Sequence, residues 1–390
     1  MRKPGWRAAV TVLAGTVALS LVSSCSRGSA PSLLSHTGVI VRTIPGTAIP
    51  SPTPTVDTAP TCADVIAGLP IRRRLAQLVM VGFTPSTPDD ALRQVENEQV
   101  GGLFIGGNDT TALHDGQLAE ARSASALPLF VAIDEEGGRV QRIPGPAGRL
   151  PSARTMTETM TSTQVRTLAT SLGRELIDLG VNVDFAPDAD VSDQPTNAVI
   201  GDRSFSDSPK VVTAYAGAFA AGLRAAGVLP VLKHFPGHGH ATGDSHTGPA
   251  ITPPLSSLLT DDLVPYRTLP VIGRTAVMVG HLDVPGLTAG VPASLSPAAY
   301  QLLRRTYRFD GVAFTDDLGS MVAVTSRYDL PDSVLLALRS GADVALWTTD
   351  SQLPAVLNRL VNAATTGELS ADRINNAVTR VLTAKGVCGD

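Results

Sequence analysis

The sequence has few cysteines, few aromatic residues and no excess of basic residues, and each shortage argues against a class of protein. Three cysteines in 390 residues are too few for a disulfide-rich scaffold. Aromatic residues make up 4%, with two tryptophans, which leaves little surface on which a long sugar polymer could stack. The net charge of −4 gives no reason to expect a nucleic-acid partner. The remaining composition, 43% hydrophobic and 17% charged, is typical of a globular protein with a sizeable core.

The first 25 residues have the pattern of an export signal. Three basic residues lie among the first seven, and residues 8–22 form an uncharged, mostly apolar run. This run is shorter than the ~20 residues that span a bilayer, but it has the length of a signal-peptide core. It ends in "VSSC", which resembles a bacterial lipobox whose cysteine, here Cys25, receives lipid; an ordinary secretory signal is the alternative. We therefore expect residues 1–25 to be a lipoprotein signal peptide, and the protein to be anchored on the cell membrane, facing the periplasm or the cell wall.

Two further segments follow the signal. Residues 26–60 are rich in Ser, Thr and Pro, which predicts an extended tether. Residues 61–390 then form one folded domain. Cys62 opens this domain and Cys388 lies near its end. In an oxidising compartment the two can form a disulfide that ties the ends of the fold together, and two unpaired thiols are the alternative.

Eight short apolar runs alternate with helix-like segments, which predicts an α/β fold with a parallel sheet. About 330 residues for eight such units fit a (β/α)8 TIM barrel, with an open doubly wound sheet as the alternative. Residues 161–180 and 207–227 are expected helices, the second capped by Ser206 or Asp207. The apolar runs are "LAQLVMVGF" (75–83), "VGGLFIGG" (100–107), "LPLFVAID" (127–134), "GVNVDFAP" (180–187), "GVLPVLKHF" (227–235), "TAVMVGHLDV" (275–284), "GVAFTDDL" (311–318) and "ADVALWTT" (342–349).

Polar residues lie within or directly after most of these runs. In a barrel the carboxyl ends of the strands meet on one face, which is where active sites lie. Because an isolated buried charge is costly, so many charged strand ends predict a functional site there. The residues are Asp134, Asp184, Asp188, Lys233, His234, His281, Asp283, Asp316, Asp317 and Trp347. Trp347 is expected either to stack on a ligand at the opening of the site or to pack inside the barrel.

The loop "KHFPGHGHATGDSHTG" (233–248) holds four of the seven histidines. A zinc site is one interpretation, but proline and glycine break the helix that would place two imidazoles on one face, and we expect no metal. A proton-handling site fits better, because Asp244 lies two residues before His246 and a carboxylate orients an imidazole and favours its charged form. With Asp316 or Asp317 opposite, such a pair has the groups that glycosidic cleavage requires; a surface turn pair is the alternative. The four candidate zinc ligands are His234, His238, His240 and His246.

Five motifs in order make the chain similar to a known family. They are "IDEEGGRVQRI" (133–143), "DFAPDADV" (184–191), "IGDRSFS" (200–206), "KHFPGHGHATGDSH" (233–246) and "FTDDLGS" (314–320). Together they resemble glycoside hydrolase family 3 over residues 71–381, and the Asp-Ser-His triplet resembles its β-N-acetylhexosaminidase branch. The resemblance implies a single-domain (β/α)8 barrel that hydrolyses terminal β-linked sugars with retention and without a cofactor.

The resemblance also implies roles for individual residues. Asp316 matches the nucleophile, a choice over Asp317 that the resemblance alone makes. His246 matches the general acid/base and Asp244 its partner. Five residues match positions that hold the hydroxyl and acetamido groups of the sugar: Asp134, Arg142, Arg203, Lys233 and His234. The lysine and arginines are expected to keep the nucleophile ionised. Glu135 stands where the family often has glutamine, and its added charge is expected to perturb sugar binding slightly.

The expected function is therefore that of a retaining exo-β-N-acetylglucosaminidase. Its expected substrates are peptidoglycan fragments in which N-acetylglucosamine is linked β-1,4 to N-acetylmuramic or anhydro-N-acetylmuramic acid. The expected partners are this small carbohydrate and, through the anchor, the membrane. A β-N-acetylglucosaminide phosphorylase and a non-catalytic sugar-binding lipoprotein are the alternatives.

Overall fold

The computed structural model describes residues 60–389 except residues 88, 144–147 and 350. The predicted signal peptide, the lipidation site Cys25 and almost all of the predicted tether lie outside the described residues. Among the helices that the structure describes, none is both long and apolar enough to cross a bilayer.

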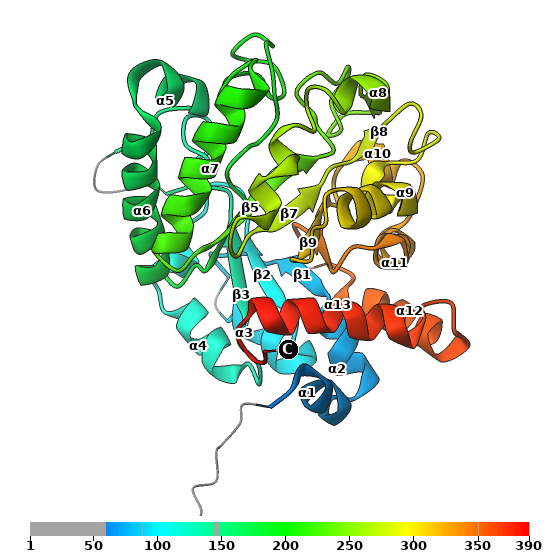
Figure 1. Cartoon of the computed structure of the whole chain (residues 1–390). Helices are drawn as coiled ribbons and strands as arrows, with labels where there is room; N and C mark the ends of the chain where they lie inside the picture. Colours follow the sequence, from blue (N-terminus) through cyan, green and yellow to red (C-terminus); the bar gives the residue numbers. More distant parts are fainter. Residues whose placement is uncertain (1–59, 88, 144–147, 350, 390) are drawn as a thin grey trace, which may run out of the picture. The chain divides into compact units, whose positions relative to one another are not determined.

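Eight parallel strands close into a barrel, which confirms the predicted (β/α)8 fold and excludes an open sheet (Figure 1). Each strand lies within one of the eight apolar runs, and nearly all strand residues are buried, as expected for a parallel sheet covered by helices. A separate two-stranded sheet pairs β6 (Ala250–Ile251) with β8 (Leu282–Asp283). In order around the barrel the strands are β1 (Val79–Gly82), β2 (Gly102–Ile105), β3 (Phe130–Ile133), β4 (Val183–Asp184), β5 (Leu229–Phe235), β7 (Ala276–Val279), β9 (Ala313–Asp317) and β10 (Val344–Trp347).

Helices surround the barrel and fill the connections between its strands (Figure 1). The α-helices are α1 (Cys62–Gly68), α2 (Ile71–Ala76), α3 (Asp90–Glu98), α4 (Gln117–Ala124), α5 (Ala153–Thr159), α6 (Ser162–Asp178), α7 (Pro209–Ala225), α8 (Leu255–Leu258), α9 (Pro297–Gln301), α10 (Val322–Thr325), α11 (Leu330–Ser340), α12 (Leu353–Thr366) and α13 (Ala371–Ala384). Shorter helical turns are η1 (Thr111–Leu113), η2 (Gly201–Arg203), η3 (Pro265–Arg267), η4 (Leu269–Val271), η5 (Ala293–Leu295) and η6 (Leu302–Thr306).

Both helices expected from periodicity are present as α6 and α7. The side chain of Thr161 caps α6 as one half of a capping box. The predicted cap of α7 at Ser206 or Asp207 is wrong, because the helix begins one or two residues later. Its N-cap is Ser208, followed by Pro209 in the first turn, where the missing N–H of proline has no cost.

Four phenylalanines meet inside the barrel, three from strands β2, β3 and β9 and one directly after β4. The ring centroids of Phe104 and Phe185, and those of Phe185 and Phe314, are 5.5 Å apart, and Phe130 lies 6.2 Å from Phe314. Aromatic contacts of this kind each add about 1 kcal/mol beyond their buried area. Phe104 and Phe185 also line a cavity at one end of the barrel, so this cluster packs directly beneath it. Trp347 is fully buried and its Nε1 donates to a main-chain carbonyl, which favours packing over sugar stacking.

A disulfide joins Cys62 at the start of α1 to Cys388 after α13. The two cysteines are separated by 326 residues, so the link ties the two ends of the barrel domain together. A main-chain bridge between Thr61 and Gly389 lies beside it.

Replacing both Cys62 and Cys388 by alanine should lower the free energy of unfolding by about 3–5 kcal/mol, because the link restricts the unfolded chain over a very long loop. Urea unfolding of the oxidised protein and the double variant measures this difference. Neither cysteine lines the cavity at the carboxyl ends of the strands, so the fold of that region should stay unchanged in the variant. An unchanged unfolding midpoint would contradict a stabilising role.

Candidate active site

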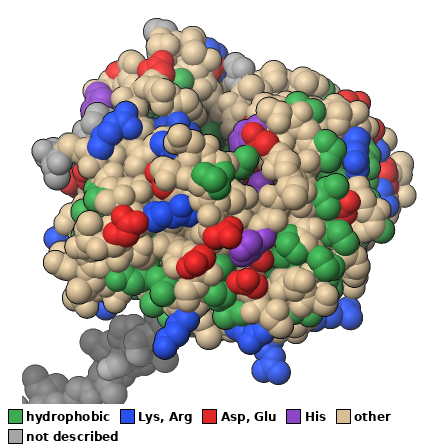
Figure 2. Space-filling view, turned by 90° about the horizontal axis from the view of Figure 1, so that it is seen from above, with side chains coloured by type: hydrophobic (Ala, Val, Ile, Leu, Met, Phe, Trp, Pro, Cys, Tyr) green, Lys and Arg blue, Asp and Glu red, His purple; other side chains and the backbone are tan. Residues whose placement is uncertain are grey.

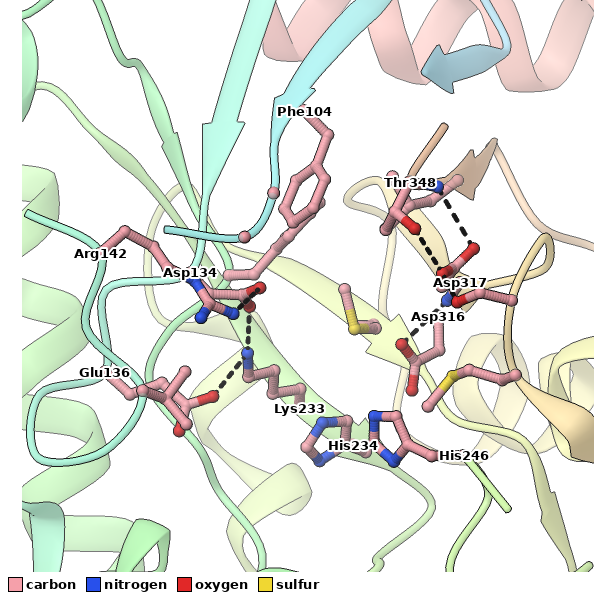
Figure 3. Close-up of a pocket in the computed structure, with 18 of the residues that line it drawn as sticks. Phe104, Asp134, Glu136, Arg142, Lys233, His234, His246, Asp316, Asp317 and Thr348 are labelled. Atoms are coloured by element: carbon pink, nitrogen blue, oxygen red, sulfur yellow. Dashed lines mark hydrogen bonds and ion pairs between the residues drawn. The ribbon is translucent and has the colours of Figure 1, made fainter. Parts of the chain in front are cut away.

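A cavity of about 530 Å³ opens where the strands of the barrel end. Figure 2 looks onto the molecule from above the view of Figure 1, and acidic and histidine side chains lie together near the middle of this face. Figure 3 shows the cavity with side chains from β2, β5 and β9 and from the loops that follow β3 and β5. Seven of the eight catalytic or sugar-binding residues expected from the sequence line it, and Asp244 contacts one of them. The seven are Asp134, Arg142, Arg203, Lys233, His234, His246 and Asp316.

One side of the cavity is a network of alternating charges. Lys233 Nζ lies 2.6 Å from Asp134 Oδ1 and 2.6 Å from Glu136 Oε1. Arg203 binds Glu136 through two hydrogen bonds of 2.8 Å each. Arg142 approaches Asp134 more loosely, at 3.8 Å. Two cations thus share the buried carboxylate of Glu136, a residue to which the sequence analysis gave no role.

The network shifts the pKa values of Glu136 and Lys233 so that each side chain stays in its charged form. Burial alone would raise the pKa of Glu136, but the charges of Arg203 and Lys233 lower it well below its usual range. Burial would lower the pKa of Lys233, but Asp134 and Glu136 raise it above its usual value. Glu136 and Lys233 therefore stay ionised near neutral pH.

Replacing Glu136 by glutamine should cost about 3 kcal/mol of stability and raise KM at least ~10-fold, because Arg203 and Lys233 then lose a shared buried counter-charge. Unfolding in urea and steady-state kinetics at pH 7 measure both effects. Glu136 has a lowered folded-state pKa, so its contribution is complete above the unfolded value of ~4.3 and is lost as the pH falls below it. The difference in the free energy of unfolding between the wild type and Glu136→Gln should therefore become smaller below about pH 4.

The matched control is Glu368→Gln, which removes an exposed ion pair with Arg339 and Arg359. This change should cost much less stability than Glu136→Gln, because exposed ion pairs contribute little to folding. Equal losses in the two variants would contradict the importance of the buried network.

His234 is held in one orientation from both sides. Its Nδ1 lies 2.8 Å from Asp190 Oδ2, and its Nε2 lies 3.3 Å from Arg203 Nη2. The two contacts fix the orientation of the imidazole ring between an acidic and a basic side chain. Asp190 also accepts from the main-chain N–H groups of His234 and His238. Asp190 therefore positions the start of the histidine loop, a role that the sequence analysis did not assign.

The structure distinguishes the two aspartates at the end of β9. Asp317 accepts hydrogen bonds on both oxygens, from the main chain of Gly319 and Thr348 and from the hydroxyls of Ser320 and Thr348. Asp316 accepts one hydrogen bond in the described part of the chain, on Oδ1 from the N–H of Asp317. Figure 3 shows Asp316 pointing into the cavity toward His246. Asp317 is a structural brace, and Asp316 is the carboxylate free to react.

Histidines keep Asp316 ionised. Burial would raise the pKa of Asp316, but the charges of His281, His234 and His246 and the N–H of Asp317 lower it below its ordinary value. Lys233 and Arg203 bind Asp134 and Glu136 instead, so a contribution of the lysine and the arginines to the ionisation of Asp316 stays a prediction. His281 is fixed by Ser294 and by the carbonyl of Asp317.

Asp244 and His246 form a close pair at the rim of the cavity. Asp244 Oδ1 lies 2.7 Å from His246 Nδ1 and accepts the main-chain N–H of His246 at 3.0 Å. Burial opposes ionisation of Asp244, but its bonds with His246 lower the pKa of Asp244 overall. With Nδ1 directed at the carboxylate, Nε2 is the nitrogen available for exchanging a proton in the cavity.

The loop that carries this pair is docked on α10. The main-chain N–H of Val322 donates to His246 O at 3.4 Å and that of Ala323 donates to Ser245 O at 3.1 Å. Earlier in the loop, Gly239 packs so closely on Val191 that a Cβ would lie 1.8 Å from the Val191 carbonyl oxygen. The loop therefore needs glycine at this position to pass the β4 connection.

The four loop histidines do not converge on one point. His234 contacts Asp190, His240 lies 3.1 Å from Asp262, and His246 contacts Asp244. His238 is buried, and neither ring nitrogen has a hydrogen-bond partner in the described residues. Within the described ranges, two groups of side chains are close enough to share a metal ion, and each contains a single histidine: Asp188, Asp190 and His234; His240, Asp261 and Asp262.

The charge of Glu135 lies away from the sugar-binding side. Glu135 is fully buried and its Oε1 accepts the main-chain N–H groups of Arg142 and Ile143, both at 2.6 Å. Burial raises its pKa to about 7. Glu135 does not line the cavity and instead holds the loop that carries Arg142, so a slight effect on sugar binding stays a prediction.

Comparison with known proteins places the chain in a family. The model of the glycosyl hydrolase family 3 N-terminal domain matches residues 70–384. The chain belongs to glycosyl hydrolase family 3. It is accordingly a glycoside hydrolase, and the (β/α)8 barrel described above is the fold found in its family 3 neighbours.

Relatives and solved structures agree with this assignment. The chain is 49% identical over 376 residues to the β-hexosaminidase LpqI of Mycobacterium tuberculosis, covering 95% of each chain. A solved family 3 glycosyl hydrolase from Mycobacterium smegmatis is 52% identical, with a TM-score of 0.79, covering 83% of this chain and 99% of that one. A family 3 β-N-acetylglucosaminidase from Paenibacillus is 31% identical, with a TM-score of 0.75, covering 82% of this chain and 62% of that one.

Proposed function

We propose that this glycoside hydrolase is a retaining exo-β-N-acetylglucosaminidase that releases terminal N-acetylglucosamine from peptidoglycan fragments. The observation that carries the proposal is the facing arrangement of Asp316 and the Asp244–His246 pair in one cavity. The names of the relatives, β-hexosaminidase and β-N-acetylglucosaminidase, support the substrate class. The assignment of the chain to a hydrolase family argues against a non-catalytic sugar-binding lipoprotein.

In the proposed first step, an oxygen of Asp316 attacks the anomeric carbon and forms a glycosyl ester. The bond from that carbon to the leaving oxygen breaks, and His246 Nε2 gives its proton to this oxygen. In the second step, water attacks the anomeric carbon and gives its proton back to His246, and the bond to Asp316 breaks. Asp244 stabilises the imidazolium when it is charged and keeps Nδ1 engaged throughout.

The charged side of the cavity supplies the groups that would hold the sugar. Asp134 and Lys233 line the cavity beside one another and can exchange hydrogen bonds with adjacent hydroxyls. Arg142 Nε is buried with no partner in the described residues, so it is a free donor for a hydroxyl or an acetamido carbonyl. The cavity is compact, and no described residue beside it is an exposed tryptophan, which favours short fragments and action at the chain end.

We further propose that the protein acts outside the cell, attached to the membrane through lipid on Cys25. Support comes from the signal-like residues 1–25 and from the disulfide, which is typical of oxidising compartments. Peptidoglycan fragments are present on that side of the membrane. Metabolic labelling with an acyl-chain probe should label the wild type, and Cys25→Ser should abolish the label.

Digestion of defined muropeptides, with and without phosphate, tests the substrate and the reaction together. Free N-acetylglucosamine and the shortened fragment are expected at equal amounts in both buffers. Sugar 1-phosphate formed only with phosphate would identify a phosphorylase instead. No release from muropeptides, despite hydrolysis of an aryl N-acetyl-β-glucosaminide, would contradict the proposed substrate.

A further inference from the structure

An apolar turn protrudes from the barrel at the amino-terminal end of β7, opposite the cavity. Val271 ends η4 and Ile272 follows it, and each side chain is 53% exposed. They are the most exposed large hydrophobic side chains among the described residues. Exposed apolar groups that lie next to one another and are rimmed by polar residues are typical of interaction surfaces.

Arginines surround this turn on both sides. A hollow on one side is lined by Arg267, Val271 and Arg308, and Arg274 lies in a second hollow on the other side. The second hollow lies at the starts of three strands, since Leu229, Thr275 and Val312 line it. We call Arg267, Val271, Ile272, Arg274 and Arg308 the basal patch.

The positive charge of the basal patch is not neutralised within the described part of the chain. Arg267 and Arg274 donate to the main-chain carbonyls of Leu259 and Ala384, and none of the three arginines forms an ion pair there. Of the residues that line the two hollows, Asp310 is the one with an acidic side chain. The surface is therefore apolar at its centre and cationic around it.

The start of the described chain lies at the same end of the barrel. Arg274 contacts the last residue of α13, and the hollow that it lines also includes Thr383 of that helix. Cys62 Sγ lies 3.5 Å from the hydroxyl of Thr383, and Cys62 is linked to Cys388 just beyond α13. The described chain therefore begins, at Pro60, on the same end of the barrel as Arg274.

We propose that the basal patch docks the barrel on an anionic lipid bilayer, with Val271 and Ile272 inserted at the interface and the arginines on lipid phosphates. Amphipathic surfaces of this composition bind anionic membranes through both kinds of contact. A membrane-held amino-terminal segment would make the contact intramolecular, so a small patch suffices. A second copy of the chain fits less well, because a two-fold contact would bring the arginines of both copies together. The docked barrel turns its cavity away from the membrane.

The test uses the chain from Asp57 onward, without lipid, so that the patch alone is measured. This unit has its own core and disulfide, and the solved M. smegmatis chain, matched over 99% of its length, shows that such a domain folds alone. Binding is measured by flotation with vesicles of phosphatidylcholine, with or without about 30% phosphatidylglycerol. Three arginines predict binding that is on the order of 100-fold tighter to the anionic vesicles and weakens with salt.

Two variants test the two parts of the patch. Val271→Ser with Ile272→Ser, and Arg267→Gln with Arg308→Gln, should each reduce anionic-vesicle binding at least ~10-fold while hydrolysis of a soluble aryl glycoside stays unchanged. The matched controls should bind as the wild type does. They are Ile251→Ser, which removes an exposed isoleucine of β6, and Arg339→Gln with Arg359→Gln, which removes the same net charge elsewhere.

Equal binding to neutral and anionic vesicles, or full binding by both patch variants, would overturn the proposal. So would a concentration-dependent dimer in sedimentation velocity that Val271→Ser with Ile272→Ser abolishes, because the patch would then bind a second copy. These outcomes test membrane binding only. The proposed hydrolase reaction is tested separately by the digestion of muropeptides.

Discussion

Replacing Asp316 by alanine should lower kcat/KM for an aryl N-acetyl-β-glucosaminide by at least ~10⁴-fold. The carboxylate would form the covalent intermediate, and no other carboxylate of the described residues takes its place, since Asp317 is held by four hydrogen bonds. Steady-state kinetics measure the loss. Unfolding of the variant should stay close to the wild type, because Asp316 makes one hydrogen bond in the described residues.

Adding azide to the variants distinguishes a nucleophilic role of Asp316 from a structural one. A small anion can occupy the space left by the side chain of Asp316→Ala and attack the anomeric carbon from the same face, which gives a glycosyl azide of inverted configuration. Asp317→Ala should lose stability and part of its activity through the brace, and azide should restore none of it. Rescue of Asp317→Ala, or full activity of Asp316→Ala, would contradict the assignment.

Replacing His246 by alanine should lower kcat/KM for a disaccharide substrate by about 10³–10⁴-fold, because an unactivated sugar oxygen needs a proton to leave. The loss should be much smaller for an aryl glycoside whose leaving group is already a weak base. Comparing the two substrates in the wild type and the variant measures the difference. Equal losses on both would contradict proton donation to the leaving group.

Two further substitutions serve as comparisons for His246→Ala. Asp244→Asn keeps the shape of the side chain but removes the charge that stabilises the imidazolium, and it should cost about 10–100-fold on the disaccharide. His240→Gln removes a histidine of the same loop that contacts Asp262 and does not line the cavity, so its activity should remain within a few-fold of the wild type.

The barrel could be predicted because each of its strands is a short apolar run, and burial of these runs on both faces follows from their composition. Glu136 was missed although a signal was present. Side chains alternate in direction along an extended segment, so Asp134 and Glu136 share a face while Glu135 points the other way. The choice between Asp316 and Asp317 could not be made in this way, because it depends on Thr348 at the end of the neighbouring strand.

Other features depend on contacts between distant segments. Asp190 can position His234 only when the segment after β4 packs against the histidine loop. The local sequence around Asp190 does not predict this contact. The start of α7 was misplaced because three candidate caps precede Pro209, and the proline decided among them.

The disulfide between Cys62 and Cys388 brings both ends of the catalytic domain to one place. A fusion or affinity tag placed after the last residue would therefore emerge beside the point where the amino-terminal segment enters. Immobilising the enzyme on a bead or an electrode through either terminus should leave its mouth facing the solution, and a bulky partner at either end should not obstruct the entry of substrate.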